Sequence, residues 1–257
     1  MPDFDADVRY LLFQVRNPDD PMRHQEVRCF ARALNCQLRQ IEVLDLLSGP
    51  PTRGHLKEVD VVLMGGSGEY SVAAGGDWLP PILEGLQQIY DIGKPAFASC
   101  WGFQAMAKAL GGEVITDQVR AEVGCYAIRL SDEGLRDPVI GPLGPTFLAA
   151  EGHQDIVTKL PPEAVLLAST TGVAHQAFTF PDKPIYCTQF HPELDRAALI
   201  ERVEVYPEYV ERVLGVTLEE FAAGCQETPV AGRILRRFLN HLMSDNKLMP
   251  SAKLRDA

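Results

Sequence analysis

The hydrophobic pattern of the first 112 residues switches repeatedly between two periods. Short apolar runs typical of buried strands alternate with stretches whose apolar residues recur every three or four positions, as on one face of a helix. The strand-like runs are 9–15, 37–47, 59–68 and 94–100, and the helix-like stretches are 24–34, 79–93 and 101–112. Such alternation predicts a parallel sheet with helices on both faces. Ligands of these sheets gather at the C-terminal ends of the strands.

From about residue 113 the pattern changes to short strands and turns, followed by helices. The strand-like segments are 113–118, 123–131, 146–161, 164–171 and 184–193, and the helix-like ones are 197–214 and 230–243. The chain shows no repeat, no low-complexity segment and no clear linker. We therefore expect a single domain with a helical C-terminal addition.

Charge and hydropathy exclude some partners. The 24 basic and 35 acidic residues give a net charge of −11, and such a surface repels phosphate backbones. No uncharged apolar run reaches the 18 residues that a membrane-spanning helix needs. The acidic first ten residues lack the pattern of a signal peptide. We expect a cytoplasmic protein with no nucleic-acid partner and no membrane span.

The cysteines are scattered through the chain and include no Cys-x-x-Cys pair. In a protein without a secretory signal, this spacing predicts neither disulfides nor a structural zinc site. Most of them should be small buried apolar side chains. They are Cys29, Cys36, Cys100, Cys125, Cys187 and Cys225.

Cys100 differs from the others because it stands where a predicted strand turns into a predicted helix. A nucleophile at such a turn is lifted out of the sheet, beside the first N–H groups of the helix. Ala98, Ser99 and Gly102 are small enough to allow the tight turn. A helix N-terminus also lowers the pKa of a thiol. Taken alone, a buried structural cysteine explains the position equally well.

Two other segments favour chemistry at Cys100. His191 and Glu193 lie two residues apart at a predicted strand end, so alternation would place them on one face. The carboxylate could then orient the imidazole toward a thiol, as in Cys-His-acid acyl transfer. The glycine-rich loop 65–71 follows another strand, and its backbone N–H could stabilise an oxyanion together with that of Trp101. A surface ion pair and an ordinary turn are the simpler alternatives.

Together these motifs resemble the class I (triad) glutamine amidotransferases. The resemblance rests on Gly-Gly at 65–66, Cys-Trp-Gly-Phe-Gln at 100–104, Phe-His-Pro-Glu at 190–193, and the stretch 151–162, which is similar to the family's Ser-His-x-Asp segment. It covers residues 8–195, which we expect to form the catalytic domain, with 196–245 as the helical extension. It implies a flavodoxin-like, doubly wound and mostly parallel α/β fold.

The resemblance also implies a role for each matched residue. Cys100 would attack the glutamine side-chain amide, His191 would carry protons, and Glu193 would orient His191. Gly66 and Trp101 would form the oxyanion hole, and the substrate would be bound by Gln104, His153, Gln154 and Asp155. This half-reaction needs no metal and no organic cofactor. The chain departs from the family at Ala98, at Ser67 and at Glu151-Gly152, where glycine, proline and serine are frequent.

Several points stay open on sequence alone. The substrate is glutamine or a γ-glutamyl compound, and a γ-glutamyl peptide hydrolase or a non-catalytic binding relative would share the same motifs. The chain carries no synthase motif, so a separate synthase subunit could accept the ammonia. The loop 65–78 could move to admit a larger leaving group. Residues 196–228 could pack on the sheet edge, cover Cys100 or form the surface of a homodimer.

Overall fold

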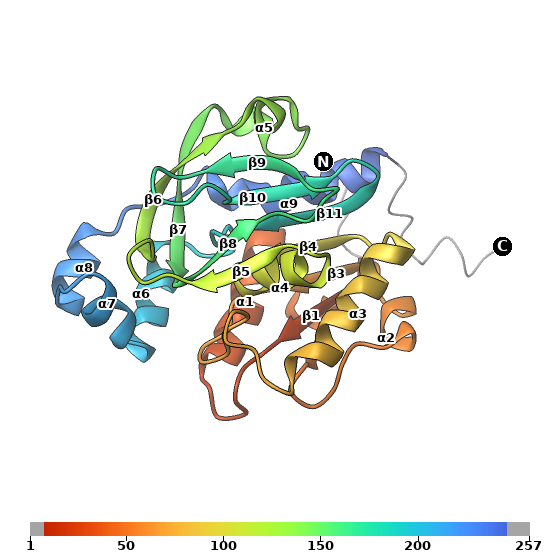
Figure 1. Ribbon diagram of the computed structural model, residues 1–257, viewed down its shortest axis with the longest axis horizontal. Coiled ribbons are helices and arrows are strands. Elements are labelled where there is room, and N and C mark those ends of the chain that lie inside the picture. The colour runs from red at the N-terminus through yellow and green to blue at the C-terminus, as the bar shows by residue number, and fades with distance from the viewer. Residues whose placement is uncertain (1–7, 246–257) are drawn as a thin grey trace.

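The computed structural model describes residues 8–245, which include a nine-stranded sheet with the strand order β2-β1-β3-β4-β11-β10-β9-β6-β7 (Figure 1). The prediction that the first ten residues are not a signal peptide concerns mainly residues 1–7, which lie outside this range. None of the helices between residues 8 and 245 is long and apolar enough to cross a membrane.

The sheet has a parallel half and an antiparallel half. Its first five strands in spatial order run parallel: β2 (Ile41–Asp45), β1 (Tyr10–Gln14), β3 (Val61–Met64), β4 (Ala96–Ser99) and β11 (Lys183–Thr188). The antiparallel part consists of β10 (Ala177–Phe180), β9 (Val165–Ser169), β6 (Glu122–Leu130) and β7 (Thr146–His153). Strands β5 (Glu113–Thr116) and β8 (Asp155–Lys159) pair separately.

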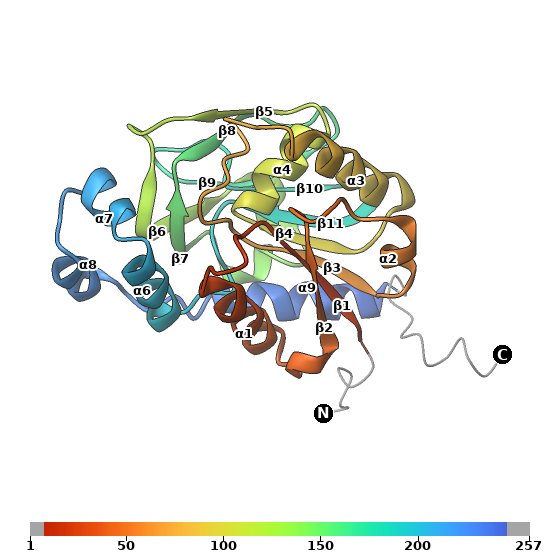
Figure 2. The same ribbon diagram turned by 90° about the horizontal axis from the view of Figure 1, so that it is seen from below.

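Helices cover both faces of the sheet, as Figure 2 shows. Helices α1 (Met22–Leu34) and α9 (Ile234–Ser244) lie on one face, and α3 (Leu79–Ile92) and α4 (Trp101–Ala109) lie on the other. Strand β1 serves both cores, because Tyr10 and Leu12 point into the first and Leu11 and Phe13 into the second. This side-chain period of two, with both faces buried, gives the continuous apolar run seen in the sequence. The predicted fold class is confirmed.

Local differences from the predicted elements have identifiable causes. The run 37–47 begins with a short 3₁₀ helix (Leu38–Gln40) before β2. The predicted helix 197–214 divides at Pro207, whose ring prevents a continuous helix. Strand β11 ends at Thr188 rather than at residue 193. Elements too short for a clear period were not predicted: β10, α2 (Arg53–Lys57), α5 (Asp132–Arg136), α8 (Leu218–Gly224), η2 (Gly141–Leu143) and η3 (Ala231–Arg233).

Helices α6 (Arg196–Val205), α7 (Glu208–Val213) and α8 gather at the end of the molecule where β6 and β7 lie (Figures 1 and 2). We call these three helices the end helices. They form a separate apolar cluster in which Leu199, Val203 and Phe221 pack with Val123 of β6 and Ala150 of β7. This cluster places α6 against the C-terminal ends of the central strands.

Candidate active site

Cys100 stands at a strained turn between β4 and α4. Its backbone has φ 51° and ψ −105°, a conformation that L-residues rarely adopt and that is typical of a nucleophile elbow. The turn is held at both ends, because Cys100 N–H donates to Thr188 O at 2.8 Å and Gly102 N–H to Gly65 O at 3.1 Å. A Cβ at Gly102 would lie 2.5 Å from the Cβ of Met64. Only glycine therefore lets α4 begin so close to β3.

His191 and Glu193 form a buried pair just beyond β11. His191 Nδ1 lies 2.6 Å from Glu193 Oε1, and both residues are almost completely buried. The predicted strand alternation is wrong as the cause, since the chain has left the sheet here. Strand β11 ends at Thr188, and beyond it His191 N–H makes an isolated bridge to Ala150 O at 2.8 Å. A turn, rather than a strand, brings the two side chains together.

The loop after β3 places a glycine against the imidazole. A Cβ built on Gly66 would lie 3.0 Å from His191 Cε1 and 3.6 Å from a guanidinium nitrogen of Arg202. Any larger residue would displace the histidine. On the other side of the thiol, the backbone N–H of Trp101 makes a hydrogen bond with Cys100. Gly66 and Trp101, the two predicted oxyanion positions, thus lie beside the imidazole and the thiol respectively.

Two cavities meet at Cys100. One has a volume of ≈ 310 Å³ and lies between the loop 67–74, the start of α4 and residues 152–155; we call it the cleft. The other has a volume of ≈ 40 Å³ and lies under α6 and α7; we call it the chamber. His191 lines the chamber and not the cleft, whereas Gln104 lines the cleft and not the chamber.

The four predicted substrate-binding residues all line the cleft, but most of their polar atoms contact protein. Gln104 Nε2 donates to Asp155 O at 2.9 Å. Both ring nitrogens of His153 face protein oxygens, Asp155 O at 3.1 Å and Glu122 Oε2 at 3.3 Å. Gln154 O accepts from Asp117 N–H at 2.9 Å. These contacts fix the shape of the cleft wall.

The Asp155 carboxylate ties the glycine-rich loop to β8. Oδ2 accepts from Ser71 Oγ at 2.7 Å and from Ala73 N–H at 3.1 Å, and Oδ1 accepts from Thr116 Oγ1 at 2.6 Å. Lys108 Nζ holds the same loop by donating to the carbonyl oxygen of residue 72 at 2.7 Å. The loop expected to move is thus anchored at several points.

The family model for "Glutamine amidotransferase class-I" matches residues 30–198. The chain belongs to the class-I glutamine amidotransferase family. A glutamine-hydrolyzing GMP synthase subunit from Sulfurisphaera tokodaii is 31% identical over 61% of this chain and 78% of its own length. The corresponding protein of Methanothermobacter thermautotrophicus is 36% identical over 48% and 64%.

Solved structures show the same fold. A glutamine amidotransferase from Thermotoga maritima superposes with a TM-score of 0.70 at 20% identity, covering 92% of this chain and 98% of the other. A proposed GMP synthase subunit from Thermoplasma acidophilum gives 0.63 at 20% identity, over 93% and 96%. At this identity the likeness concerns the fold alone.

The resting charge state of Cys100 in this amidotransferase differs from the sequence expectation. Burial raises the pKa of the Cys100 thiol to about 12, and the charge of Glu151 adds to this. The N–H of Trp101 at the helix N-terminus lowers that pKa, as predicted, and so does Arg202, but desolvation outweighs both. The predicted effect of the helix N-terminus is therefore present but smaller than that of burial, and the thiol needs a base in order to react.

Arg202 is a charged residue in the site that the sequence motifs did not indicate. It is carried by α6, beyond the residues that the family model matches, and it lines the chamber with only 9% of its surface exposed. Its Nη1 lies 3.5 Å from His191 Nδ1. Burial opposes ionisation of Glu193, but the charges of His191 and Arg202 outweigh burial and lower the pKa of this carboxyl. Nothing in the sequence around a single arginine on a helix indicates that its side chain will lie in an active site.

A second buried polar cluster lies behind the cleft. Ligand atoms of Glu122, Glu151 and His153 lie within 4.8 Å of one another, so this set could hold a metal ion. Glu122 already accepts from Thr170 Oγ1 at 2.7 Å and Gln176 Nε2 at 2.6 Å. These bonds indicate a hydrogen-bond network within the sheet. Burial and the neighbouring Glu122 raise the pKa of Glu151 well above its usual range.

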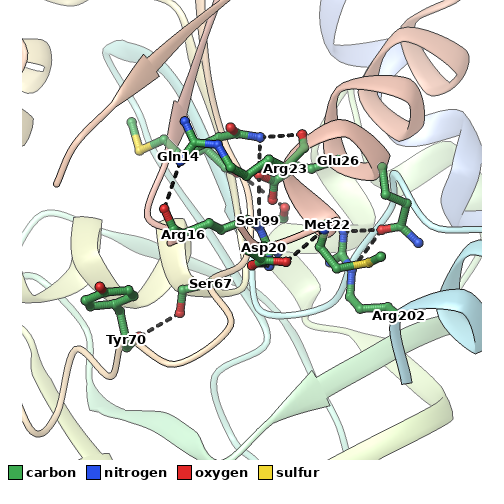
Figure 3. A network of polar contacts seen from close by, with 12 residues as sticks. Gln14, Arg16, Asp20, Met22, Arg23, Glu26, Ser67, Tyr70, Ser99 and Arg202 are labelled. Carbon is green, nitrogen blue, oxygen red and sulfur yellow. Dashed lines mark hydrogen bonds and ion pairs between the residues drawn. The ribbon is translucent and has the colours of Figure 1, made fainter. Parts of the chain in front are cut away.

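A buried arginine, Arg16, also connects the end helices to the N-terminal part of the chain, and Figure 3 shows it beside Gln14, Asp20 and Glu26. Arg16 Nη1 donates to Asp20 Oδ2 at 3.1 Å and to Tyr206 Oη at 3.0 Å, and Arg16 Nε lies 3.4 Å from Glu26 Oε2. Tyr206 follows α6 directly. The network therefore fixes the C-terminal end of α6 over the chamber.

Proposed function

We propose that this amidotransferase hydrolyses the side-chain amide of glutamine to glutamate and ammonia through a thioester at Cys100. The observation that carries the proposal is the buried His191–Glu193 pair, 2.6 Å between Nδ1 and Oε1, at the wall of a cavity that Cys100 also lines. With Glu193 on Nδ1, the other ring nitrogen is left to exchange protons in that cavity. A thiol whose pKa is raised by burial requires such a base.

The proposed reaction has two steps. His191 takes the thiol proton while Cys100 Sγ bonds to the amide carbon. The carbon–nitrogen bond then breaks, and the nitrogen takes the proton from His191 and leaves as ammonia. Water, deprotonated by His191, adds to the thioester carbon, the carbon–sulfur bond breaks, and the thiol regains its proton. In both steps the N–H groups of Gly66 and Trp101 would stabilise the negative oxygen.

The two cavities support an orientation for the substrate. The leaving nitrogen must face His191, which protonates it, and His191 lines the chamber. The amino-acid end of the substrate then occupies the cleft, whose wall includes Gln104 and residues 152–155. A chamber of ≈ 40 Å³ holds a few water-sized molecules. Ammonia fits there, and the small size of the chamber favours glutamine over a γ-glutamyl peptide as the substrate.

We further propose that residues 8–195 carry the chemistry and 196–245 form an extension that closes the chamber. The relatives from Sulfurisphaera and Methanothermobacter are named as subunits of a synthase. These names support a separate partner protein that would accept the ammonia. The other association that we propose is a homodimer through the end helices.

The test is glutamate release by the purified chain with glutamine and with γ-glutamyl peptides. Cys100→Ala should lower turnover by roughly 10⁴-fold, the scale of losing a triad member. Cys36→Ala, which removes a thiol outside both cavities, is the matched control and should retain activity. Turnover of peptides but not of glutamine would instead indicate a γ-glutamyl hydrolase. No turnover of either substrate, also in the presence of a synthase partner, would favour a binding protein.

A further inference from the structure

Arg202 places a positive charge inside the catalytic centre from outside the part of the chain that the family model matches. The side chain enters the chamber from α6 and reaches within 3.5 Å of His191 Nδ1. It is also close to the oxyanion loop, since a Cβ at Gly66 would lie 3.6 Å from its Nη1. A buried guanidinium has a large desolvation cost unless it is paired. The role of the Arg202 guanidinium therefore depends on the groups that surround it.

The guanidinium is held in place by a neutral partner. Arg202 Nε and Nη2 donate to Gln25 Oε1 at 3.2 and 3.1 Å, the two dashed contacts that start from Arg202 in Figure 3. Gln25 Nε2 in turn donates to Ala198 O at 2.8 Å and to Glu201 Oε2 at 3.2 Å. Since Gln25 is buried on α1, two helices fix the fork of Arg202. Its charge is oriented by Gln25 but not neutralised by it.

Ionisable groups from four other parts of the chain face this charge, together with one beside α6. His191 and Glu193 lie after β11, Cys100 before α4, and Cys29 on α1; Tyr206, at the end of α6, interacts with the same guanidinium. Glu151 of β7 shares the chamber wall with Arg202. Among these, only the triad members Cys100, His191 and Glu193 take part in the proposed reaction.

We propose that Arg202 is a positioning residue whose positive charge, held beside His191 and Cys100, offsets the charge of Glu193 and favours loss of the Cys100 proton. The inference rests on the roles proposed above for Cys100 and His191. Glu193 opposes the Cys100 thiolate, and Arg202, 3.5 Å from the ring nitrogen that Glu193 contacts, counters this effect. Arg202 also stabilises the Cys100 thiolate directly, in the direction that favours nucleophilic attack.

Both effects of the charge have the same sign. A nearby positive charge favours the deprotonated form of a thiol and of an imidazolium alike. Removing it should raise the pKa of Cys100, and the pH at which Cys100 becomes reactive should rise with it. A purely structural role for Arg202 would alter stability but would not move this pH dependence.

The experiment measures the rate at which iodoacetamide alkylates Cys100 of the full chain at each pH from 5 to 10, and the shift of this rate profile along the pH axis gives the change in apparent pKa. The peptide that contains Cys36 is the internal reference. This readout does not require glutamine turnover. Arg202→Met should raise the apparent pKa of alkylation by about one unit and slow the reaction about tenfold at neutral pH. Arg202→Lys, which keeps the charge, should stay near the wild type. Arg28→Met removes an exposed arginine that pairs with α6 and should change nothing.

The outcomes separate charge from packing. An unshifted profile in Arg202→Met, or an equal shift in Arg202→Met and Arg202→Lys, overturns the proposal. If Arg202→Met does not fold, Gln25→Leu releases the guanidinium without removing it, and a smaller upward shift is then the required result. The acidic limb of kcat/KM for glutamine should move in parallel. If the wild type releases no glutamate, the proposed function fails, yet the alkylation profile still decides the role of Arg202.

Discussion

The two cavities that meet at Cys100 are built in opposite ways. The cleft, ≈ 310 Å³, is walled by loop backbone and polar side chains, and Asp155 holds its loop through three hydrogen bonds. The chamber, ≈ 40 Å³, is walled by apolar side chains of α6 together with Arg202 and Glu151. The larger cavity, with its polar side chains, suits the charged end of an amino acid, and the smaller cavity suits a small leaving group. The substrate orientation proposed above follows from this contrast.

The largest expected effect comes from enlarging the chamber. Leu199 and Val203 line it, and in the wild type we expect glutamine to be preferred over γ-glutamyl methylamide by about 10²-fold, the scale of one misfitting methyl group. Leu199→Ala or Val203→Ala should reduce this preference to about tenfold, as measured by the ratio of kcat/KM values.

Val213→Ala is the control, because Val213 belongs to the same apolar cluster but does not line the chamber. Each variant loses some packing, up to about 2–5 kcal/mol for the leucine, so folding is checked by thermal unfolding. A wild type that hydrolyses the methylamide as fast as glutamine would remove the contrast between the cavities.

A change of similar size, in KM rather than in substrate preference, is expected from loosening the cleft. Asp155→Ala removes both acceptor oxygens, and with them the hydrogen bonds that hold the loop at Ser71 and Ala73. We expect KM for glutamine to rise about tenfold, with a smaller change in kcat, because His191 and the chamber are unaffected. Asp117→Asn, at an exposed turn nearby, is the control. A fall in kcat with KM unchanged would contradict the proposal that the cleft binds the substrate while His191, at the chamber, carries out the chemistry.

The smallest expected effects are changes in thermal stability when one of two buried carboxyl groups, Glu151 or Glu193, is replaced by an amide. The pKa of Glu151 is raised in the fold, so its contribution to stability is full at low pH and is lost as pH rises through the folded pKa. Glu151→Gln should therefore raise Tm by a few degrees at pH 8 to 9, with less gain near pH 5.

The pKa of Glu193 is lowered, so Glu193→Gln should lower Tm at pH 7, and this difference should shrink as pH falls below about 4. If the change in Tm relative to the wild type depended on pH in the same way in both variants, the opposite pKa directions given for Glu151 and Glu193 would be contradicted.

Much of the fold could be predicted because its signals are local and strong. Alternating apolar periods predicted β1, α1, β3, α3, β4 and α4, and the small residues around Cys100 predicted the elbow. Short elements such as β10 and α8 span too few residues for a period to be recognised. His191 and Glu193 were correctly predicted to meet, although by the wrong geometry. The sequence pattern did not show that β11 ends at Thr188, before His191 is reached.

By itself the sequence determined the doubly wound sheet, the family, and the candidate nucleophile with its histidine and glutamate. These depend on contiguous motifs, in which neighbouring residues act together. Only the tertiary structure decided which charges surround Cys100. Arg202 reaches His191 from α6, and Gln25 of α1, 177 residues away along the chain, holds its guanidinium. The electrostatics of a buried site depend on distances through space, and no spacing along a sequence encodes them.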